Sequence, residues 1–258
     1  MGRFNGATVL ITGATGGLGS AAAKAFAAEG AQLVLSDLNE AALADFAATL
    51  DAERAILGGN IADEKLSEDL VKLAVEEFGR LDIAVNNAGI VHSFVRLPQV
   101  TSEEAHRVVE VDLLGVFYAL KHQIPQMERQ FRESGKGGVI VNIASVAGLS
   151  GAPKLSVYAA AKHGVVGLTR SAAVEYASKG IRINAVCPAH TRTAMVDGFV
   201  RFTGAPEAEA LAELTRGVPM KRVAEVDEIT TGILFLADPA NSFMTGHALA
   251  LDGGIGAI

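Results

Sequence analysis

Cysteine, tryptophan and long apolar runs are scarce in this sequence or missing from it. The 258 residues include one cysteine and no tryptophan. The single cysteine, Cys187, excludes an intrachain disulfide and fits a reducing compartment. No apolar stretch reaches membrane-spanning length without charges or glycine, and the start of the chain has no hydrophobic signal core. We therefore expect a cytoplasmic location and no membrane partner.

Basic charge is also scarce. The formal net charge is −7, and no basic stripe with interleaved aromatic residues occurs, so nucleic acid is not a predicted partner. No long charge run or low-complexity block suggests disorder. Hydrophobic residues make up 50% of the chain, which is enough to bury a sizeable core. No metal site is predicted.

Apolar runs and helical patterns alternate along the whole chain. Several of the runs are continuously apolar, as expected for strands covered on both faces. The pattern predicts an α/β fold: a single domain, residues 1–258, with a Rossmann-like, doubly wound parallel sheet of about seven strands and helices on both faces. Strands are expected at 7–11, 33–35, 55–57, 81–85, 139–143, 181–186 and 248–251. Helices are expected at 18–28, 39–50, 63–79, 102–127, 156–177 and 225–236, with Asp63 and Ser156 as N-caps and Pro125 near the end of its helix.

A glycine-rich turn, Thr12 to Gly19, separates the first predicted strand from the first predicted helix. Glycine allows a pyrophosphate to approach the backbone, and a helix N-terminus offers free N–H groups and partial positive charge. The alternative is a tight turn with no ligand. In this strand–turn–helix context we predict dinucleotide binding, through Gly13, Thr15, Gly17, Leu18 and Gly19.

Asp37 follows the second predicted strand, where a carboxylate can hydrogen-bond the ribose hydroxyls of an adenosine. The same charge would repel a 2′-phosphate, and the next residue, Leu38, is not basic. These two residues favour NAD over NADP as the cofactor. The alternative reading is that Asp37 caps the next helix.

Tyr158 and Lys162 lie at i and i+4, on one face of a predicted helix. A tyrosine is a poor base near neutral pH, but a nearby ammonium favours the phenolate and lowers the pKa. Tyr158 could then take the proton of an alcohol while a nicotinamide ring accepts the hydride. Ser145, just after a predicted strand, could hydrogen-bond the substrate oxygen.

The chain resembles the short-chain dehydrogenase/reductase family, in its typical NAD-dependent subfamily, from about Gly6 to Gly254. The likeness rests on the joint order of its motifs, each of which is modest alone. They are the glycine-rich turn, Asn86-Asn87-Ala88-Gly89, Ser145, Tyr158 with Lys162, Pro188, and Asp252-Gly253-Gly254.

The resemblance implies roles for individual positions. Tyr158 would be the acid/base, Ser145 would polarise the substrate oxygen, and Lys162 would lower the Tyr158 pKa and hold the nicotinamide ribose. Thr191 stands where the family often has valine or isoleucine, whose main chain meets the carboxamide. Further cofactor contacts are expected from Asn60, Ile61, Asn87, Ala88, Gly89, Pro188 and Thr193.

Three positions depart from the family pattern. Asp112 replaces an asparagine whose main-chain carbonyl holds a water in a proton relay to the lysine. A main-chain role survives the change, so Asp112 is a predicted relay member, although its carboxylate could shift the titration of Lys162. Asn60 stands where aspartate often meets the adenine, and Ala189 replaces a glycine.

The predicted substrate pocket is apolar. Its expected residues are Ser145, Val146, Ala147, His92, Met195 and Phe199, the last two on a mobile lid spanning about 193–222. The alternative for His92 is a solvated loop side chain. Such a lining fits an apolar or cyclic secondary alcohol, which the enzyme would oxidise to the ketone with NAD. Alternatives are an NADPH-dependent 3-ketoacyl or carbonyl reductase and a non-catalytic NAD-binding regulator.

Two predicted helices, 108–120 and the one after Tyr158, are apolar on most sides. A helix of this kind needs more cover than one sheet face provides. The family commonly pairs these helices between subunits, so a homotetramer is expected.

Overall fold

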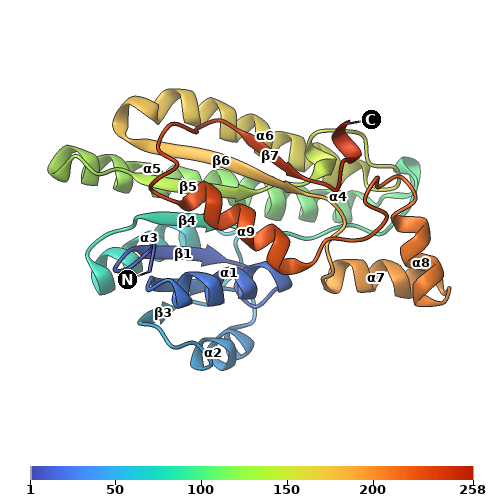
Figure 1. Cartoon of the computed structure of the whole chain (residues 1–258), viewed down its shortest axis with the longest axis horizontal. Coiled ribbons are helices and arrows are strands. Elements are labelled where there is room, and N and C mark those ends of the chain that lie inside the picture. The colour runs from blue at the N-terminus through green and yellow to red at the C-terminus, as the bar shows by residue number, and fades with distance from the viewer. Residues whose placement is uncertain (1, 258) are drawn as a thin grey trace.

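The computed structural model describes residues 2–257, in which one seven-stranded sheet forms the centre of the molecule (Figure 1). All neighbouring strands are parallel, and their order is β3-β2-β1-β4-β5-β6-β7. The predicted doubly wound parallel sheet is confirmed. The strands are β1 (Thr8–Thr12), β2 (Gln32–Ser36), β3 (Arg54–Ile56), β4 (Ile83–Asn86), β5 (Gly138–Ile143), β6 (Ile181–Pro188) and β7 (Ala248–Leu251).

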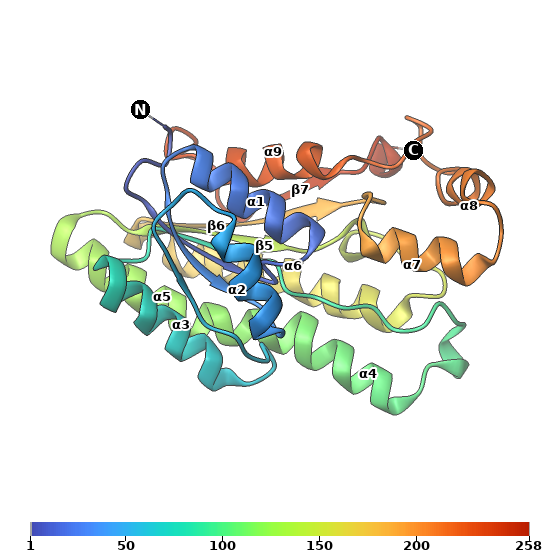
Figure 2. The same ribbon diagram turned by 90° about the horizontal axis from the view of Figure 1, so that it is seen from below.

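Helices cover both faces of the sheet (Figure 2). One face carries α1 (Gly17–Ala28), α2 (Glu40–Ala48) and α9 (Val226–Ala237). The other carries α3 (Glu64–Phe78), α5 (Gly115–Ser134) and α6 (Ser156–Tyr176). Further helices are α4 (Ser102–Val109), α7 (Ala194–Thr203) and α8 (Glu207–Leu214), with short turns η1 (Leu97–Gln99), η2 (Glu110–Leu114), η3 (Val146–Gly148), η4 (Ala177–Lys179) and η5 (Ile255–Ala257).

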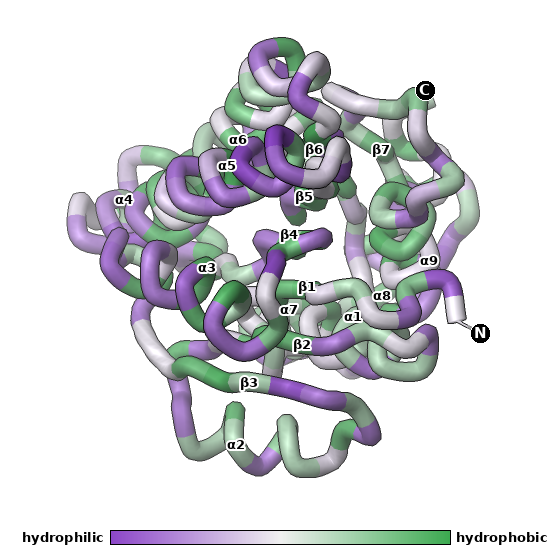
Figure 3. The backbone as a smooth tube through the Cα atoms, turned by 90° about the vertical axis from the view of Figure 1, so that its left-hand side faces the viewer, coloured by the Kyte–Doolittle hydropathy of each residue, from purple (hydrophilic) through white to green (hydrophobic). Residues whose placement is uncertain are grey.

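The two faces have separate hydrophobic cores because successive strand residues point to opposite sides. In β1, Val9 and Ile11 belong to the core on the side of α1, whereas Leu10 belongs to the core on the side of α3. Figure 3 shows the hydrophobic residues gathered along the central strands. The continuous apolar run of β1 is therefore a strand that is covered on both faces.

Two helix N-caps were predicted, Asp63 for α3 and Ser156 for α6. Asp63 accepts a hydrogen bond from Lys65 N at 3.0 Å, and Gly79 ends α3 with φ 77°, as predicted. The prediction that Ser156 caps α6 is wrong. Leu155 occupies the N-cap position, Ser156 is already helical, and its buried Oγ has no partner among the described residues.

The helix predicted at 102–127 differs in two ways from the structure. A π-helical turn, η2, separates α4 from α5, and α5 continues to Ser134, where Gly135 ends it with φ 71°. Pro125 is exposed and lies inside α5, where its missing N–H removes a single bond while Ile124 and Met127 stay buried. The π turn places Asp112 inward, with a fully buried side chain.

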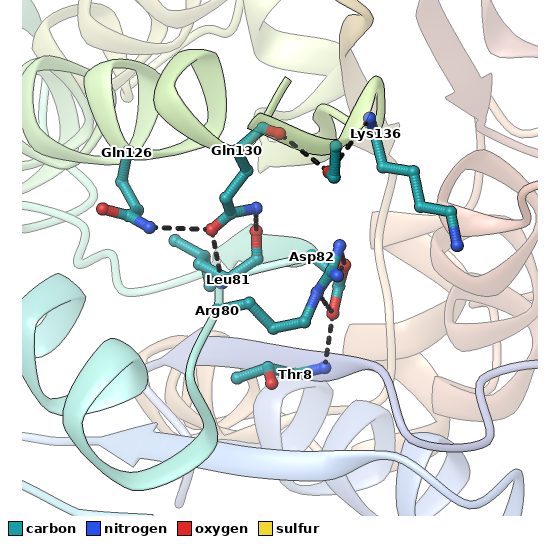
Figure 4. Close-up of polar contacts among 8 residues, drawn as sticks. Thr8, Arg80, Leu81, Asp82, Gln126, Gln130 and Lys136 are labelled. Atoms are coloured by element: carbon teal, nitrogen blue, oxygen red, sulfur yellow. Dashed lines mark hydrogen bonds and ion pairs between the residues drawn. The ribbon is translucent and has the colours of Figure 1, made fainter. Parts of the chain in front are cut away.

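A polar network fastens α5 to the amino-terminal end of β4, far from the carboxyl edge of the sheet (Figure 4). The Gln130 side chain accepts from Leu81 N and donates to Leu81 O, both at 2.9 Å, and Gln126 donates to Gln130 at 2.9 Å. Asp82 accepts from Thr8 N at 3.0 Å. Leu81 is fully buried, so Gln130 satisfies backbone groups that no water can reach.

Replacing Gln130 by methionine should destabilise the fold. The thioether keeps the volume but leaves the buried N–H and C=O of Leu81 without partners, at a cost of roughly 2–4 kcal/mol. Urea unfolding measures the change. Arg129→Met, at the exposed neighbouring position, is the control and should unfold like the wild type. Equal stability of the two variants would contradict a structural role for Gln130.

The chain order places a crevice at the carboxyl ends of the central strands. From β1 the chain moves outward to β2 and β3, then returns to β4 on the other side of β1. Connections on opposite sides of this switch point diverge and leave a gap above the strand ends. Predicted site residues follow each of the strands β1 to β6 at this edge, and Tyr158 and Lys162 lie on α6.

Candidate active site

A cavity of about 750 Å³ lies at this edge of the sheet. It is lined from the glycine-rich turn at one end to α7 at the other. Every predicted cofactor residue except Gly19, which lies against the Gly13 carbonyl, lines it: Gly13, Thr15, Gly17, Leu18, Asp37, Leu38, Asn60, Ile61, Asn87, Ala88, Gly89, Tyr158, Lys162, Pro188, Thr191 and Thr193.

The glycine-rich turn has no room for a side chain at Gly13 or Gly19. A Cβ on Gly13 would lie 2.9 Å from Ala88 Cα, and one on Gly19 would collide with the Gly13 carbonyl. The N-cap of α1 is Gly16, which has no side chain to cap the first-turn N–H groups, and that turn contains no acidic residue. These features fit an anionic group such as a pyrophosphate at the helix N-terminus.

Asp37 is held in place by the same turn. Its Oδ2 accepts from Thr15 N at 2.9 Å and from Thr15 Oγ1 at 2.6 Å, and its Oδ1 accepts from Leu38 N at 2.7 Å. The alternative that Asp37 caps the next helix is wrong, because Asn39 caps α2 by accepting from Ala42 N at 3.0 Å. Asp37 is thus a half-buried carboxylate fixed toward the cavity.

Asn87 joins the two sides of the crevice. Its Nδ2 donates to the carbonyls of Thr12 and Gly13 at 2.9 and 3.0 Å. The backbone N–H groups of Asn87 and Ala88 both donate to Thr12 Oγ1 at 3.1 Å. The segment after β4 is therefore fixed against the end of β1.

Ser145, Tyr158 and Lys162 meet in the middle of the cavity lining and are 9%, 8% and 3% exposed. Lys162 Nζ donates to Ile143 O at 3.1 Å and lies 5.6 Å from the centre of the Tyr158 ring. Ser145 Oγ accepts from Ala147 N at 3.1 Å. The fold thus brings Ser145, which follows β5, to the two predicted side chains of α6.

Asp112 is part of this cluster. Its Oδ2 lies 3.2 Å from Lys162 Nζ, and its Oδ1 accepts from Ile90 N at 2.8 Å. Burial raises the pKa of Asp112, and the Lys162 charge opposes that rise. Burial alone would lower the pKa of Lys162, but the Asp112 carboxylate, Tyr158 and Cys187 together outweigh it, and that pKa is raised. Sequence reasoning expected a relay role and a possible effect on Lys162, but not a closed ion pair.

The expected lowering of the Tyr158 pKa is not the net result in this structure. Burial raises the pKa of the Tyr158 hydroxyl, and the Lys162 charge counters the rise only in part. The physical reason is the deep position of the ring, which penalises the phenolate. The charge of Lys162 still lowers the pKa of Tyr158, as predicted.

Val146, Ala147, Met195 and Phe199, which were predicted as substrate contacts, also line the cavity. His92 neither lines the cavity nor faces solvent, so both interpretations of it are wrong. Its ring is 2% exposed, is not part of the cavity lining, and places Nδ1 2.7 Å from Ser93 O. The loop turns this side chain inward and presents Phe94 instead, whose ring centre lies 5.4 Å from that of Phe199.

Some lining residues were missed by sequence reasoning. Phe94 follows shortly after the Asn-Asn-Ala-Gly motif, so its place in the chain could have indicated it. Leu214 on α8 and Ile255 on η5 come from distant parts of the chain, and no local pattern marks them.

Within residues 2–257 no helix combines the length and apolar character that crossing a membrane requires. The same residues contain no group of three or more His, Cys, Asp or Glu side chains placed to hold a metal ion.

Comparison with solved structures shows close likeness over nearly the whole chain. The structure of levodione reductase superposes with a TM-score of 0.93 at 38% identity and covers 99% of both chains. An NAD⁺-bound xylitol dehydrogenase gives a TM-score of 0.91 at 32% identity, covering 97% of this chain and 99% of that one. A tyrosine-to-phenylalanine variant of ElxO with NADPH bound gives 0.88 at 30%, covering 98% and 99%.

Comparison of sequences identifies the family. Levodione reductase of Leifsonia aquatica is 41% identical, and the match covers 98% of this chain and 95% of that protein. Cyclohexanol dehydrogenase of an Acinetobacter species is 37% identical over 97% of this chain and 95% of that protein. A family model described as enoyl-(acyl carrier protein) reductase matches residues 13–256. The chain belongs to the short-chain dehydrogenase/reductase family and is an oxidoreductase that acts on CH–OH groups with a nicotinamide cofactor.

Proposed function

We propose that this enzyme oxidises apolar or cyclic secondary alcohols to ketones and uses NAD. The observation that carries the proposal is the cluster of Ser145, Tyr158 and Lys162 in one cavity with the carboxylate of Asp37. The cluster of Ser145, Tyr158 and Lys162 can remove the proton of an alcohol, and the Asp37 carboxylate can hydrogen-bond the hydroxyls of an adenosine ribose.

The chain's own residues divide the work at the substrate oxygen. Tyr158 removes the proton of the alcohol hydroxyl, and Ser145 hydrogen-bonds the same oxygen as it becomes a carbonyl. Lys162 favours the tyrosinate by its charge, and Asp112 lies behind it as a relay member. The bound nicotinamide would accept the hydride, held by the cofactor residues named above.

The preference for NAD rests on Asp37. Its carboxylate accepts hydrogen bonds from hydroxyls and repels a phosphate, and Leu38 beside it is 73% exposed and uncharged. Similar structures hold NAD⁺ in one case and NADPH in another, so the family alone does not select the cofactor. An NADPH-dependent reductase is therefore the second candidate.

The preference for an apolar or cyclic substrate rests on the aromatic residues over the site. Phe94 contacts Phe199, and the ring centres of Phe94 and Phe202 lie 6.1 Å apart. Two relatives act, by their names, on cyclohexanol and levodione. We propose that the chain is one catalytic domain, residues 1–258, whose segment 193–222 closes as a lid over the substrate.

We further propose a homotetramer in the cytoplasm that binds neither nucleic acid nor membranes. Phe117 on α5 is 42% exposed and Val174 on α6 is 82% exposed, which leaves apolar surface on the two helices expected to pair between subunits. The net charge of −7 disfavours contact with phosphate backbones.

A coupled absorbance assay tests the function. NADH formation is followed with cyclohexanol, a carboxylated cyclohexanol, a sugar alcohol and an aliphatic secondary alcohol, with NADP in parallel. We expect the highest kcat/KM with an uncharged ring alcohol and NAD. A preference for the sugar alcohol would contradict the substrate class, and a preference for NADP would contradict the role of Asp37.

A further inference from the structure

The Asp112 carboxylate is closed off from solvent beside the acid/base pair. It is 0% exposed, and the lysine beside it is 3% exposed. Both oxygens of Asp112 face a positive or hydrogen-bonding group: Oδ1 meets Ile90 N at 2.8 Å and Oδ2 meets Lys162 Nζ at 3.2 Å. The pair therefore ties η2 to α6 and to the segment after β4.

The segment after β4 leaves room for this pair. A Cβ on Gly89 would lie 3.2 Å from Lys162 Nζ and 3.3 Å from Asp112 Oδ2, tighter than ordinary contact. An asparagine at position 112 could not satisfy both neighbours at once. If the asparagine oxygen accepted from Ile90 N, the NH₂ group would face the Lys162 ammonium, and two donors would oppose each other. If the side chain were flipped, the NH₂ group would face the N–H of Ile90 instead. The surroundings of Asp112 suit a carboxylate.

We infer that Asp112 is a positioning residue that holds Lys162 in a neutral ion pair and so moves alcohol oxidation to higher pH. The inference rests on the proposed function and concerns the charge around its base. Next to a lone ammonium, loss of a proton from Tyr158 or Lys162 relieves a net positive charge. Next to the ion pair, the same loss creates a net negative charge in a buried place, and this costs more free energy.

The direction of the expected pH shift does not depend on whether Tyr158 or Lys162 releases the proton. Tyr158 and Lys162 titrate as a coupled unit, and a carboxylate within a few ångströms makes the first loss harder in either case. Burial, opposed by Lys162, raises the pKa of Asp112, but alkaline conditions, where a tyrosine base operates, keep a carboxyl group ionised.

Other titratable groups near the pair do not supply a compensating charge. Cys187 on β6 also bears on Tyr158 and Lys162, but burial raises the pKa of its thiol to about 11. His190 lines the cavity, and burial lowers the pKa of its ring, so it is neutral in the same pH range. Ser145 is uncharged, and Asp37 lies at the adenosine end of the cavity.

The test is the pH profile of alcohol oxidation by Asp112→Asn under saturating NAD. We expect its alkaline-rising limb to move to lower pH by about one unit or more, because opposite charges within 4–6 Å shift a pKa by that amount. Asp45→Asn, which removes an exposed charge on α2, should superimpose on the wild type. Tyrosinate absorbance of the NAD complex, with Tyr158→Phe as the blank, should show the same displacement.

Superimposed profiles of Asp112→Asn and the wild type would overturn the inference, since Asp112 would then carry no charge during turnover. A limb moved to higher pH would overturn it equally. If Asp112→Asn does not fold, Asp112→Ala removes the same charge without an amide facing the ammonium, and the same outcomes apply. Full activity of Tyr158→Phe would instead contradict the proposed function, so the two failures are distinct.

Discussion

Replacing Tyr158 by phenylalanine is expected to lower kcat for alcohol oxidation roughly a thousand-fold, the middle of the range for losing a general acid/base. The change removes one hydroxyl. The ring keeps its place among Val108, Ala147 and Ala161, so folding should be unaffected. Steady-state rates at saturating NAD and alcohol give the loss, and thermal unfolding checks that the fold is retained.

Tyr176→Phe is the matched control for this prediction. Tyr176 ends the same helix, is partly buried and packs in the core away from the cavity, so its loss of a hydroxyl should leave turnover unchanged. Binding of NADH, followed by its fluorescence, should be retained in both variants. If Tyr158→Phe kept more than about a tenth of the wild-type kcat, the role given to Tyr158 would be wrong. Such a loss would be smaller than the roughly hundred-fold minimum that is typical for removing an acid/base group.

The fold was predictable because its signals are local and agree with one another. A strand buried on both faces must be continuously apolar, and Val9 to Ile11 is such a run. The stop of α3 at Gly79 needs a left-handed residue, and glycine is the natural choice there. The alternation of such units admits few arrangements other than a doubly wound sheet.

The errors lie where several distant groups determine one residue. Ser156 looks like a cap in sequence, yet the backbone enters the helix one residue earlier. His92 and Phe94 are close in the chain, and only the surrounding packing decides that the phenylalanine faces the cavity. The π turn that buries Asp112 has no periodic signature, so the closed ion pair with Lys162 could not be anticipated.

The candidate site was more predictable than its electrostatics. The motifs fix which side chains reach the carboxyl edge of the sheet, because each follows a strand of known direction. A pKa depends instead on depth and on every neighbouring charge. The rise that burial imposes on the Tyr158 pKa follows from the completed packing and from no single motif.

Replacing Asp37 by alanine is expected to raise KM for NAD roughly 10- to 100-fold and to reduce the preference for NAD over NADP by at least as much. A hydrogen bond to a charged group contributes about 1.5–3 kcal/mol, and about 1.4 kcal/mol corresponds to a factor of ten. Thr15 N and Thr15 Oγ1 both donate to the Asp37 carboxylate. Alanine offers no oxygen that could replace it as an acceptor for the ribose hydroxyls. Initial rates with each cofactor measure the change.

Asp37→Asn separates charge from hydrogen bonding. The amide oxygen can still accept from Thr15, while the repulsion of a 2′-phosphate is lost, so NADP should gain more than NAD loses. Asp51→Ala, at an exposed position beyond α2, removes a charge elsewhere and should leave both cofactors unchanged. An unaltered NAD preference in Asp37→Ala would remove the electrostatic basis for NAD, because contacts other than the Asp37 carboxylate would then select the cofactor.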